Sequence, residues 1–353
     1  RHRRHRRHRR RRRLRQQRTR PLVDIYHTHL AMKSFAILSL FIAASVAQSN
    51  TSNPLIPSGI SEGCSAYLES LNNNSTFASC LTPITSATSQ FTPGANSSNI
   101  TTTTISTALN GLCSSSAFSA CPDSTVRAQL MAFYSACSGE LTTDRNDDVL
   151  RNYDALYVLT PLRQAICSKS DNGSYCVTQL PSTSSGSSAT GSEALVTSGS
   201  TQEALQNYLY TTPDIASSVL SRRDTSNTTT ALIPNVTTYQ NTNLVFLFLE
   251  PTMTEAQLCT TCTRNILTPY ITFESSLPYA PGLANSLLLA GQSALYNATL
   301  TICPTGFLSG AVQAAGGLSG GILSSSVPRT ISADVSLLVS AILGAAGLAI
   351  AAI

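Results

Sequence analysis

The sequence predicts a mainly α-helical domain that is stapled by disulfides and carries a long disordered insertion rich in Ser and Thr. Apolar residues recur at helical spacing in cysteine-bearing segments on both sides of residues 181–231. All ten cysteines follow residue 63, and an even number of cysteines is typical of a disulfide framework in an oxidising compartment. The insertion itself has too few apolar side chains to offset the entropy that ordering would cost.

The N-terminal 47 residues are expected to be absent from the folded protein. Met32 opens the stretch "MKSFAILSLFIAASVAQS", in which Lys33, an apolar run and small residues before the cleavage point form a secretory signal peptide at 32–47. The apolar run is too short to span a bilayer. Because such a signal lies at the amino terminus, we interpret residues 1–31 as a non-native upstream extension. The alternative, that its thirteen arginines form a nucleic-acid-binding arm, conflicts with the signal that follows.

Loss of residues 1–47 reverses the charge and removes every histidine. Lys plus Arg falls from 23 to 9 and Asp plus Glu from 18 to 17, so the net charge becomes 9 − 17 = −8. A phosphate backbone is repelled by such a chain, and no nucleic acid partner is expected. Without histidine, the protein can form neither a catalytic triad that uses an imidazole nor a metal site with histidine ligands. We therefore predict no cofactor and no metal site. The histidines concerned are His2, His5, His8, His27 and His29.

A polar lead at residues 48–63 precedes the first cysteine-bearing part, residues 64–180. Its clearest helix follows Asp123 or Ser124, either of which can serve as N-cap. The apolar positions of that helix are Val126, Leu130, Phe133, Tyr134, Cys137 and Leu141. Residues 96–107 have β-branched side chains but no alternating apolar face, so they are predicted to form a glycosylated loop.

A second helical pattern in this part begins near Val149. It is predicted to end near Thr160, where a new helix begins with threonine as cap and Pro161 at its first position. The apolar stripe of the earlier segment comprises Val149, Leu150, Tyr153, Leu156 and Tyr157, and the new helix would turn Leu162, Ile166 and Cys167 inward.

The Ser/Thr-rich linker, residues 181–231, is interrupted only by a short predicted helix around 203–210. Arg222 and Arg223 form a candidate dibasic processing site, with solvated surface charge as the alternative.

The second cysteine-bearing part spans residues 232–306. Its apolar run at 243–251 is predicted to be a buried strand or a packed extended segment. Thr252 and Glu255 then form a capping-box pattern before a helix. That helix would place Leu258, Cys259, Cys262 and Ile266 on one face, and a last helix after Pro281 would carry Leu283, Leu287, Leu288 and Leu295.

The C-terminus has the layout of a signal for a glycosylphosphatidylinositol (GPI) anchor. A Gly/Ser-rich stalk at 307–326 ends in three serines, of which Ser324 is the predicted attachment residue. Residues 327–353 then form the attachment signal, a short spacer followed by an uncharged tail. The alternative is a retained membrane anchor, although no Lys or Arg follows the tail.

Two sets of residues are expected to be modified outside the cytosol. The predicted disulfide residues are Cys64, Cys80, Cys113, Cys121, Cys137, Cys167, Cys176, Cys259, Cys262 and Cys303, with a pairing that the sequence leaves open. The predicted N-glycosylation sites are Asn50, Asn73, Asn74, Asn96, Asn99, Asn172, Asn227, Asn235 and Asn297.

Two motifs suggest chemistry, and each has a structural alternative that we favour. Cys259 and Cys262 have the spacing of a redox pair but lack the βαβ setting of thioredoxin-like proteins, so we expect them to clamp their helix to two other segments. A run of acidic residues could supply the paired carboxylates of a glycoside hydrolase. Its members are Glu140, Asp144, Asp147, Asp148 and Asp154, of which Asp147 and Asp148 more simply complement a helix dipole. The same acids could bind calcium, but the ligand spacing and the central glycine of an EF-hand are absent.

The segments "CSAYLESLNNNSTFASC", "YDALYVLTPLRQAICS" and "LCTTCTRNILTPYITFESSLPYAPGLANSLLLAGQSALY" resemble an uncharacterised family of secreted fungal proteins. That family is a domain of unknown function, often followed by a Ser/Thr-rich segment and a GPI signal. The resemblance covers about Cys64 to Cys303 and implies that the two cysteine-bearing parts form one domain around the insertion. It implies no reaction.

These features predict a glycoprotein outside the cell, held by a glycolipid anchor in the outer leaflet of the plasma membrane or in the cell wall. Its role would be structural, adhesive or ligand-binding, with a cell-wall glycan or a surface protein as partner, and it is not expected to be an enzyme. Two alternatives stay open. A cell-wall polysaccharide hydrolase would need two carboxylates facing each other in a cleft, and a lipid-binding helical bundle would need an enclosed apolar cavity.

Overall fold

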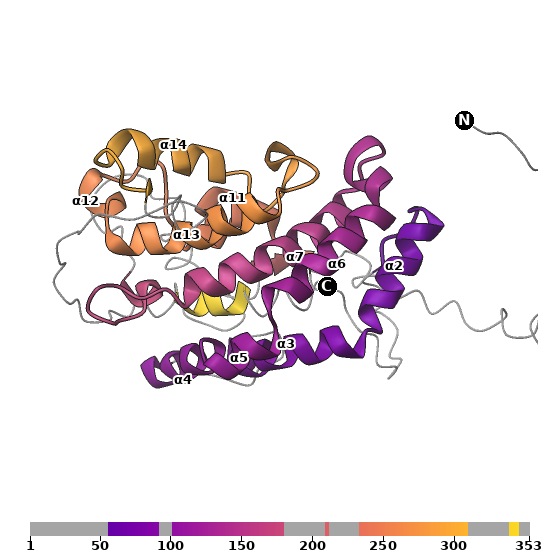
Figure 1. Ribbon diagram of the computed structural model, residues 1–353, viewed down its shortest axis with the longest axis horizontal. Coiled ribbons are helices and arrows are strands. Elements are labelled where there is room, and N and C mark those ends of the chain that lie inside the picture. Colours follow the sequence, from indigo (N-terminus) through magenta and orange to yellow (C-terminus); the bar gives the residue numbers. More distant parts are fainter. Residues whose placement is uncertain (1–55, 92–100, 180–208, 212–232, 310–338, 346–353) are drawn as a thin grey trace, which may run out of the picture. The chain divides into compact units, whose positions relative to one another are not determined.

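The structure, a computed structural model, describes residues 56–91, 101–179, 209–211, 233–309 and 339–345, all within the compact unit Asn53–Ile353. The described residues are mainly helical, which confirms the predicted fold class (Figure 1). The signal peptide, the predicted attachment residue Ser324 and the dibasic pair Arg222–Arg223 lie outside these residues. The predicted domain boundaries stay predictions.

The structure describes six α-helices within residues 56–91 and 101–179, and polar side chains of the type preferred at N-caps cap five of them. The helices are α2 (Glu62–Asn72), α3 (Ser75–Thr88), α4 (Thr102–Leu112), α5 (Ser115–Ala120), α6 (Asp123–Ala136) and α7 (Asp147–Ile166). Shorter turns are the 3-10 helices η1 (Ser89–Phe91) and η3 (Cys176–Gln179) and the π-helix η2 (Gly139–Thr143). The capping residues are Ser61, Asn74, Thr101, Ser114 and Asn146.

β2 (Ile233–Pro234), at the start of the second part, pairs antiparallel with the two-residue strand β1 (Tyr210–Thr211), which lies within the predicted linker. Four α-helices follow, namely α11 (Val236–Thr242), α12 (Glu255–Leu258), α13 (Thr261–Ser276) and α14 (Gln292–Ile302). The 3-10 helices are η4 (Leu244–Phe246) and η5 (Leu283–Asn285), and residues 339–345 are also helical.

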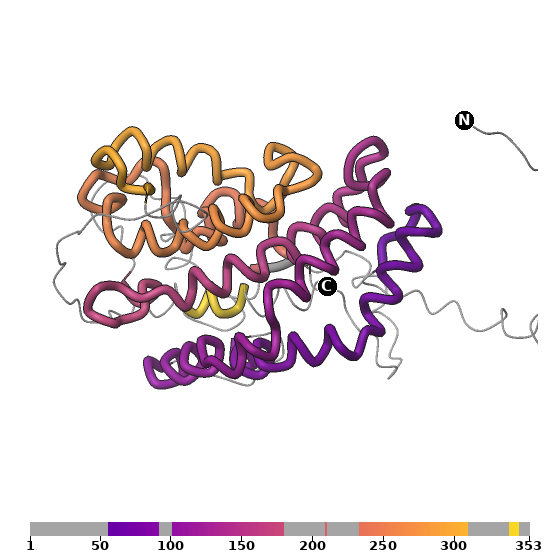
Figure 2. Tube along the Cα trace, viewed as in Figure 1, coloured from indigo at the N-terminus to yellow at the C-terminus, as the bar shows by residue number. Residues whose placement is uncertain are grey.

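The two parts meet where α7 packs against α13, as the tube trace also shows (Figure 2). Both helices contribute to one hydrophobic core, which also includes side chains of α2, α3, α4, α6 and α14. α7 is buried on nearly every side from Tyr153 to Ile166, whereas a surface helix buries only one face. The central position of α7 explains why its sequence lacks a polar face over this stretch.

The predicted break at Thr160–Pro161 is wrong, because α7 continues through Pro161 to Ile166. A proline inside a helix removes one backbone hydrogen bond and is normally a terminator. Here Thr160 and Pro161 are buried within the core, so packing on all sides stabilises the helix at the residue that would otherwise end it.

Two further predictions in the first part need correction. Residues 102–107 belong to α4 and not to a loop, because Ile105, Ala108 and Leu109 form a buried face at helical spacing. Of the remainder of the predicted loop, Thr101 is the N-cap of α4, and residues 96–100 lie outside the described residues. α6 begins at Asp123 itself, with Pro122 as N-cap and no side-chain capping bond, so neither Asp123 nor Ser124 is the cap.

The apolar run at 243–251 is not a strand. It folds into η4 and a tight turn in which Asn243, Leu247 and Phe248 have positive φ angles of 46°, 55° and 62°. Left-handed backbone is rare for Leu and Phe, and such residues persist only where packing fixes them. All side chains from Leu244 to Leu249 are buried, which supplies that packing.

The helix starts of the second part also differ from the prediction. The capping box is formed by Thr254 and Gln257, two residues later than the predicted pair. Residues 283–291 contain only η5 and turns, so the α-helix predicted after Pro281 starts only at Gln292 and includes Leu295 but not Leu287 or Leu288.

Candidate functional site

The Cys-Thr-Thr-Cys motif lies across a helix junction. α12 ends at Leu258, Cys259 is its C-cap, and α13 starts at Thr261, so Cys259 and Cys262 do not share one helix as predicted. A new N-cap at Thr260, which accepts the N–H of Thr263, separates the two helices. The motif therefore gives the chain two anchor points at a bend.

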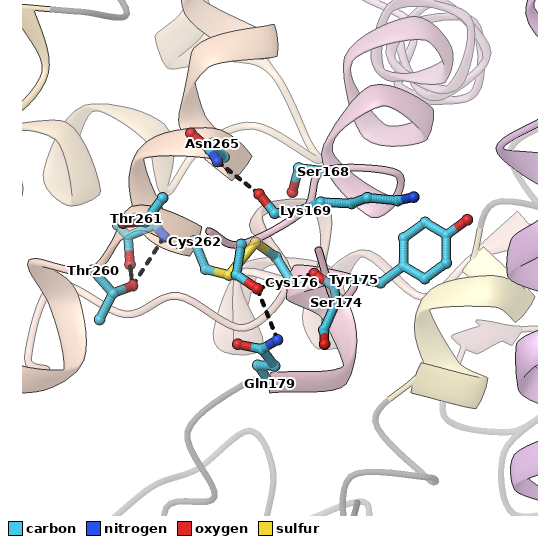
Figure 3. Close-up of a disulfide and its surroundings, with 12 residues drawn as sticks. Ser168, Lys169, Ser174, Tyr175, Cys176, Gln179, Thr260, Thr261, Cys262 and Asn265 are labelled. Atoms are coloured by element: carbon cyan, nitrogen blue, oxygen red, sulfur yellow. Dashed lines mark hydrogen bonds between the residues drawn. A yellow bond between two sulfur atoms is a disulfide. The ribbon is translucent and has the colours of Figure 1, made fainter. Parts of the chain in front are cut away.

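The two cysteines of the motif are bonded to different segments, and neither is free. Cys259 pairs with Cys303, and Cys262 pairs with Cys176 (Figure 3). The chain has no free cysteine, so this motif holds no dithiol for redox exchange in this state. The expected clamp to two other segments is what the structure shows.

All ten cysteines form five disulfides, which confirms the predicted framework. The pairs are Cys64–Cys137, Cys80–Cys121, Cys113–Cys167, Cys176–Cys262 and Cys259–Cys303. Of these, only the bond between Cys176 and Cys262 joins the part before the insertion to the part after it.

Hydrogen bonds reinforce the junction around Cys176–Cys262. Asn265 Nδ2 donates to the carbonyl of Lys169 at 2.8 Å (Figure 3), and Thr261 Oγ1 donates to a carboxylate oxygen of Asp171 at 2.8 Å. Both bonds cross from α13 to the loop after α7, so polar contacts between the same two segments accompany the disulfide.

The predicted acidic cluster does not form one carboxylate pair, because most of its members have separate partners. Glu140 accepts the N–H of Ser61 at 2.6 Å. Asp147 and Asp148 stand in the first turn of α7 and pair with Arg145 and Arg151, as a helix start favours. Asp144 is the C-cap residue of η2. These contacts hold the chain in place, and Asp147 and Asp148 stand at a helix start, as predicted.

Asp154, the last acidic residue of the run, is a fully buried carboxylate in the middle of α7. Tyr279 and Ser286 donate hydroxyl hydrogen bonds to its Oδ1, the latter at 2.9 Å. The backbone N–H groups of Leu287 and Leu288 donate to Oδ2 at 2.6 and 3.2 Å. One carboxylate thus holds the segment between α13 and α14, which has no α-helix of its own.

Burial raises the pKa of Asp154 to about 6, although the four donors favour the charged form. Burial also raises the pKa of Tyr279, and the neighbouring carboxylate adds to that increase. Tyr153 and Tyr157 surround the pair, with ring centroids 5.5 and 5.0 Å from that of Tyr279. A perturbed pKa is a feature of many active sites. Here the carboxylate has no exposed surface, so its evident task is to position the segment.

Sequence reasoning missed Arg163, a buried cation of α7. Its guanidinium donates to the carbonyls of Ala117 and Cys121 at 3.2 and 3.0 Å and lies 4.2 Å from the ring centroid of Phe118. Burial lowers the pKa of Arg163, and Asp123 opposes that shift. The end of a short helix presents unpaired carbonyls, and this side chain satisfies them at the end of α5.

Five of the nine predicted glycosylation sites lie in the described residues. Asn73, Asn172 and Asn297 are exposed. Asn74 and Asn235 are half-buried N-caps whose Oδ1 atoms accept N–H groups of α3 and α11. A glycan bonds to Nδ2, so these caps would keep their acceptor. Asn50, Asn96, Asn99 and Asn227 lie outside the described residues, and occupancy of all nine sites stays a prediction.

The described part of the chain contains neither a cluster of metal ligands nor a membrane-spanning helix. No group of three or more potential ligands is placed to hold a metal ion there. Nor does any helix among these residues combine the length and apolar character that crossing a membrane requires.

Residues 48–196 match the family described as "Domain of unknown function (DUF7729)". The match includes the first cysteine-bearing part and the start of the insertion, and the description names no activity. Neither the comparison with curated proteins nor that with solved structures gives a match.

Proposed function

We propose that this chain is a secreted, N-glycosylated cell-surface protein of fungal type, held by a GPI anchor and serving a structural, adhesive or ligand-binding role. The observation that supports it most is the pairing of all ten cysteines in five disulfides, since such frameworks persist in oxidising compartments. The signal layout at 32–47 and the anchor layout after Ser324 are sequence features that indicate the same destination, the secretory pathway and the cell surface.

A binding role is favoured over hydrolysis. The most perturbed carboxylate, Asp154, is enclosed by donors and has no surface for a substrate. Glu140, Asp147 and Asp148 are engaged in contacts that organise the backbone. The ligand class that suits a cell-surface glycoprotein of this kind is a cell-wall glycan or a neighbouring surface protein.

The anchor is tested by expressing the chain from Met32 in a fungal host and treating intact cells with phosphatidylinositol-specific phospholipase. We expect release of a glycosylated protein that lacks the residues after the attachment site. Retention on the cells, with the C-terminal tail detected by mass spectrometry, would reject a glycolipid anchor.

The role is tested on the released protein with a glycan array and a polysaccharide-degradation assay. Saturable glycan binding without shortening of the polysaccharide supports a binding module. Release of shorter sugars, abolished by substitution of an exposed acidic residue, would favour the hydrolase.

A further inference from the structure

The short helix at residues 339–345 is unusual because all seven residues are buried. In Figure 1 it is the yellow segment. A surface helix exposes its polar face, whereas this one has Ser340 as its only polar side chain. Its apolar residues belong to the same hydrophobic core as those of α3, α4 and α7. The segment therefore fills a slot in the protein.

The contact at Gly344 shows how closely the segment fits. A Cβ atom at Gly344 would lie 2.6 Å from Leu209 Cδ1 and 3.2 Å from the backbone carbonyl of Phe91. Phe91 and Leu209 are themselves 1% exposed. Leu209 precedes β1, and its carbonyl accepts a hydrogen bond from the N–H of Asn235 at 2.9 Å. This bond connects Leu209, which contacts the segment, to the second part of the domain.

These seven residues lie inside the proposed anchor signal, which would be removed when the glycolipid is attached. A helix of this length is about 10 Å long. Its loss would leave an apolar space, and such a space is costly unless the walls collapse or an apolar group enters. The tail thus occupies the slot in the precursor, and its removal would vacate this apolar space.

We propose that the processed protein binds a single hydrocarbon chain of a lipid in the slot left by residues 339–345, with Phe91 and Leu209 in its wall. This inference rests on the proposed removal of the tail. A hydrocarbon chain matches the uncharged, apolar segment that it replaces, and a lipid headgroup would stay outside. Membrane lipids are the nearest source of such chains for a protein anchored in a bilayer.

The test compares two oxidised chains, residues 48–324 and 48–353, produced in a bacterial periplasm, which adds no anchor. The probe is cis-parinaric acid, a fluorescent fatty acid. We expect the short chain to bind one equivalent at least about tenfold more tightly than the long chain, because a tethered segment competes at high effective concentration.

Two substitutions locate the site. Leu209→Asp in the short chain should weaken probe binding at least about tenfold by placing a charge in the wall. Leu300→Asp is the matched control, since Leu300 is 66% exposed, and it should leave binding unchanged. Gly344→Leu in the long chain should expel the segment and restore binding, which keeps the test informative if Leu209→Asp does not fold.

Equal binding by the two chains, no binding by either, or dimerisation of the short chain without probe uptake would each overturn the lipid site. Failure of phospholipase release rejects anchoring alone, whereas failure of probe binding by the short chain rejects the slot alone. The two results are therefore distinguishable.

Discussion

Cys176 and Cys262 are joined by a disulfide across 86 residues of sequence, with their Cα atoms 5.2 Å apart. The bond connects η3, which follows α7, to the first turn of α13. It spans the Ser/Thr-rich insertion, so the insertion can be long without separating the two parts of the domain.

Replacing Cys176 and Cys262 by serine should lower the free energy of unfolding by about 2–5 kcal/mol, because the unfolded chain regains the freedom of a long loop. Urea denaturation measures this change. Trypsin cleavage within residues 212–232 should leave the two fragments of the native protein linked on a non-reducing gel and should separate those of the variant.

The control for that cleavage is the double variant Cys259→Ser with Cys303→Ser. It also loses a disulfide, but both residues lie after the insertion, so its fragments should stay linked. Separation of the control fragments would show that the pairing described here is wrong.

Asp154→Leu should destabilise the fold by about 3–5 kcal/mol, because it leaves two hydroxyls and two backbone N–H groups buried without an acceptor. Asp154→Asn should cost less, about 1–3 kcal/mol, since one oxygen remains to accept. Urea midpoints compare the three proteins. Equal stability of the two variants would contradict the role of these hydrogen bonds.

The pH dependence of stability should carry a contribution from Asp154. Its folded pKa of about 6 lies above the ordinary value of 3.8, so the folded state binds the proton more tightly. That contribution to stability is largest at acidic pH and is lost as the pH rises through 6. We therefore expect the stability difference between the native protein and Asp154→Asn to grow from pH 7 to pH 4, by up to about 3 kcal/mol. A stability difference that shrinks over this range would show that folding lowers the pKa of Asp154, which contradicts the account.

Arg163→Lys should lower stability by about 1–3 kcal/mol, because an ammonium cannot reach both carbonyls at the end of α5 or stack on Phe118 as a guanidinium does. Chemical denaturation provides the measurement. The matched control is Arg145→Lys, whose ion pair with Asp147 is exposed, and its effect should stay within about 0.5 kcal/mol. Similar losses in both variants would refute the capping role.

Gly291→Ala should destabilise the protein by about 1–3 kcal/mol, because the added Cβ would overlap the side-chain amide of Asn243. That amide donates to the carbonyl of Leu249 at 3.0 Å and fixes the left-handed turn. Gly139→Ala has open space around its Cβ and serves as control in thermal unfolding. A neutral Gly291→Ala would show that the turn tolerates repacking.

Local patterns predicted much of the helical structure. The apolar stripes of α6 and of the first half of α7 follow 3.6-residue spacing, and Val126, Leu130 and Phe133 are buried as expected. Local patterns failed where distant packing decides the backbone. Pro161 is carried through a helix by burial on all sides, and Leu247 and Phe248 take left-handed angles that no sequence pattern indicates.

The polar sites show the same limit. Asp154 was visible only as one acid among several, because Tyr279 and Ser286 lie 125 and 132 residues away in sequence. The cysteines could be counted but not paired, since any pairing is compatible with the same spacing. The clamp formed by Cys259 and Cys262 was inferred from the missing βαβ setting and from a shared helical face, whereas the helix break between them depends on the cap at Thr260.

Intact mass spectrometry of the protein released from cells that express it from Met32 tests most directly whether this is an oxidised ectodomain freed of both terminal signals. We predict a chain that begins at Gln48, ends near Ser324 with a remnant of the glycolipid, carries N-glycans and takes up no alkylating agent without reduction. A chain that retains residues 327–353 and is alkylated at its cysteines without reduction would contradict it.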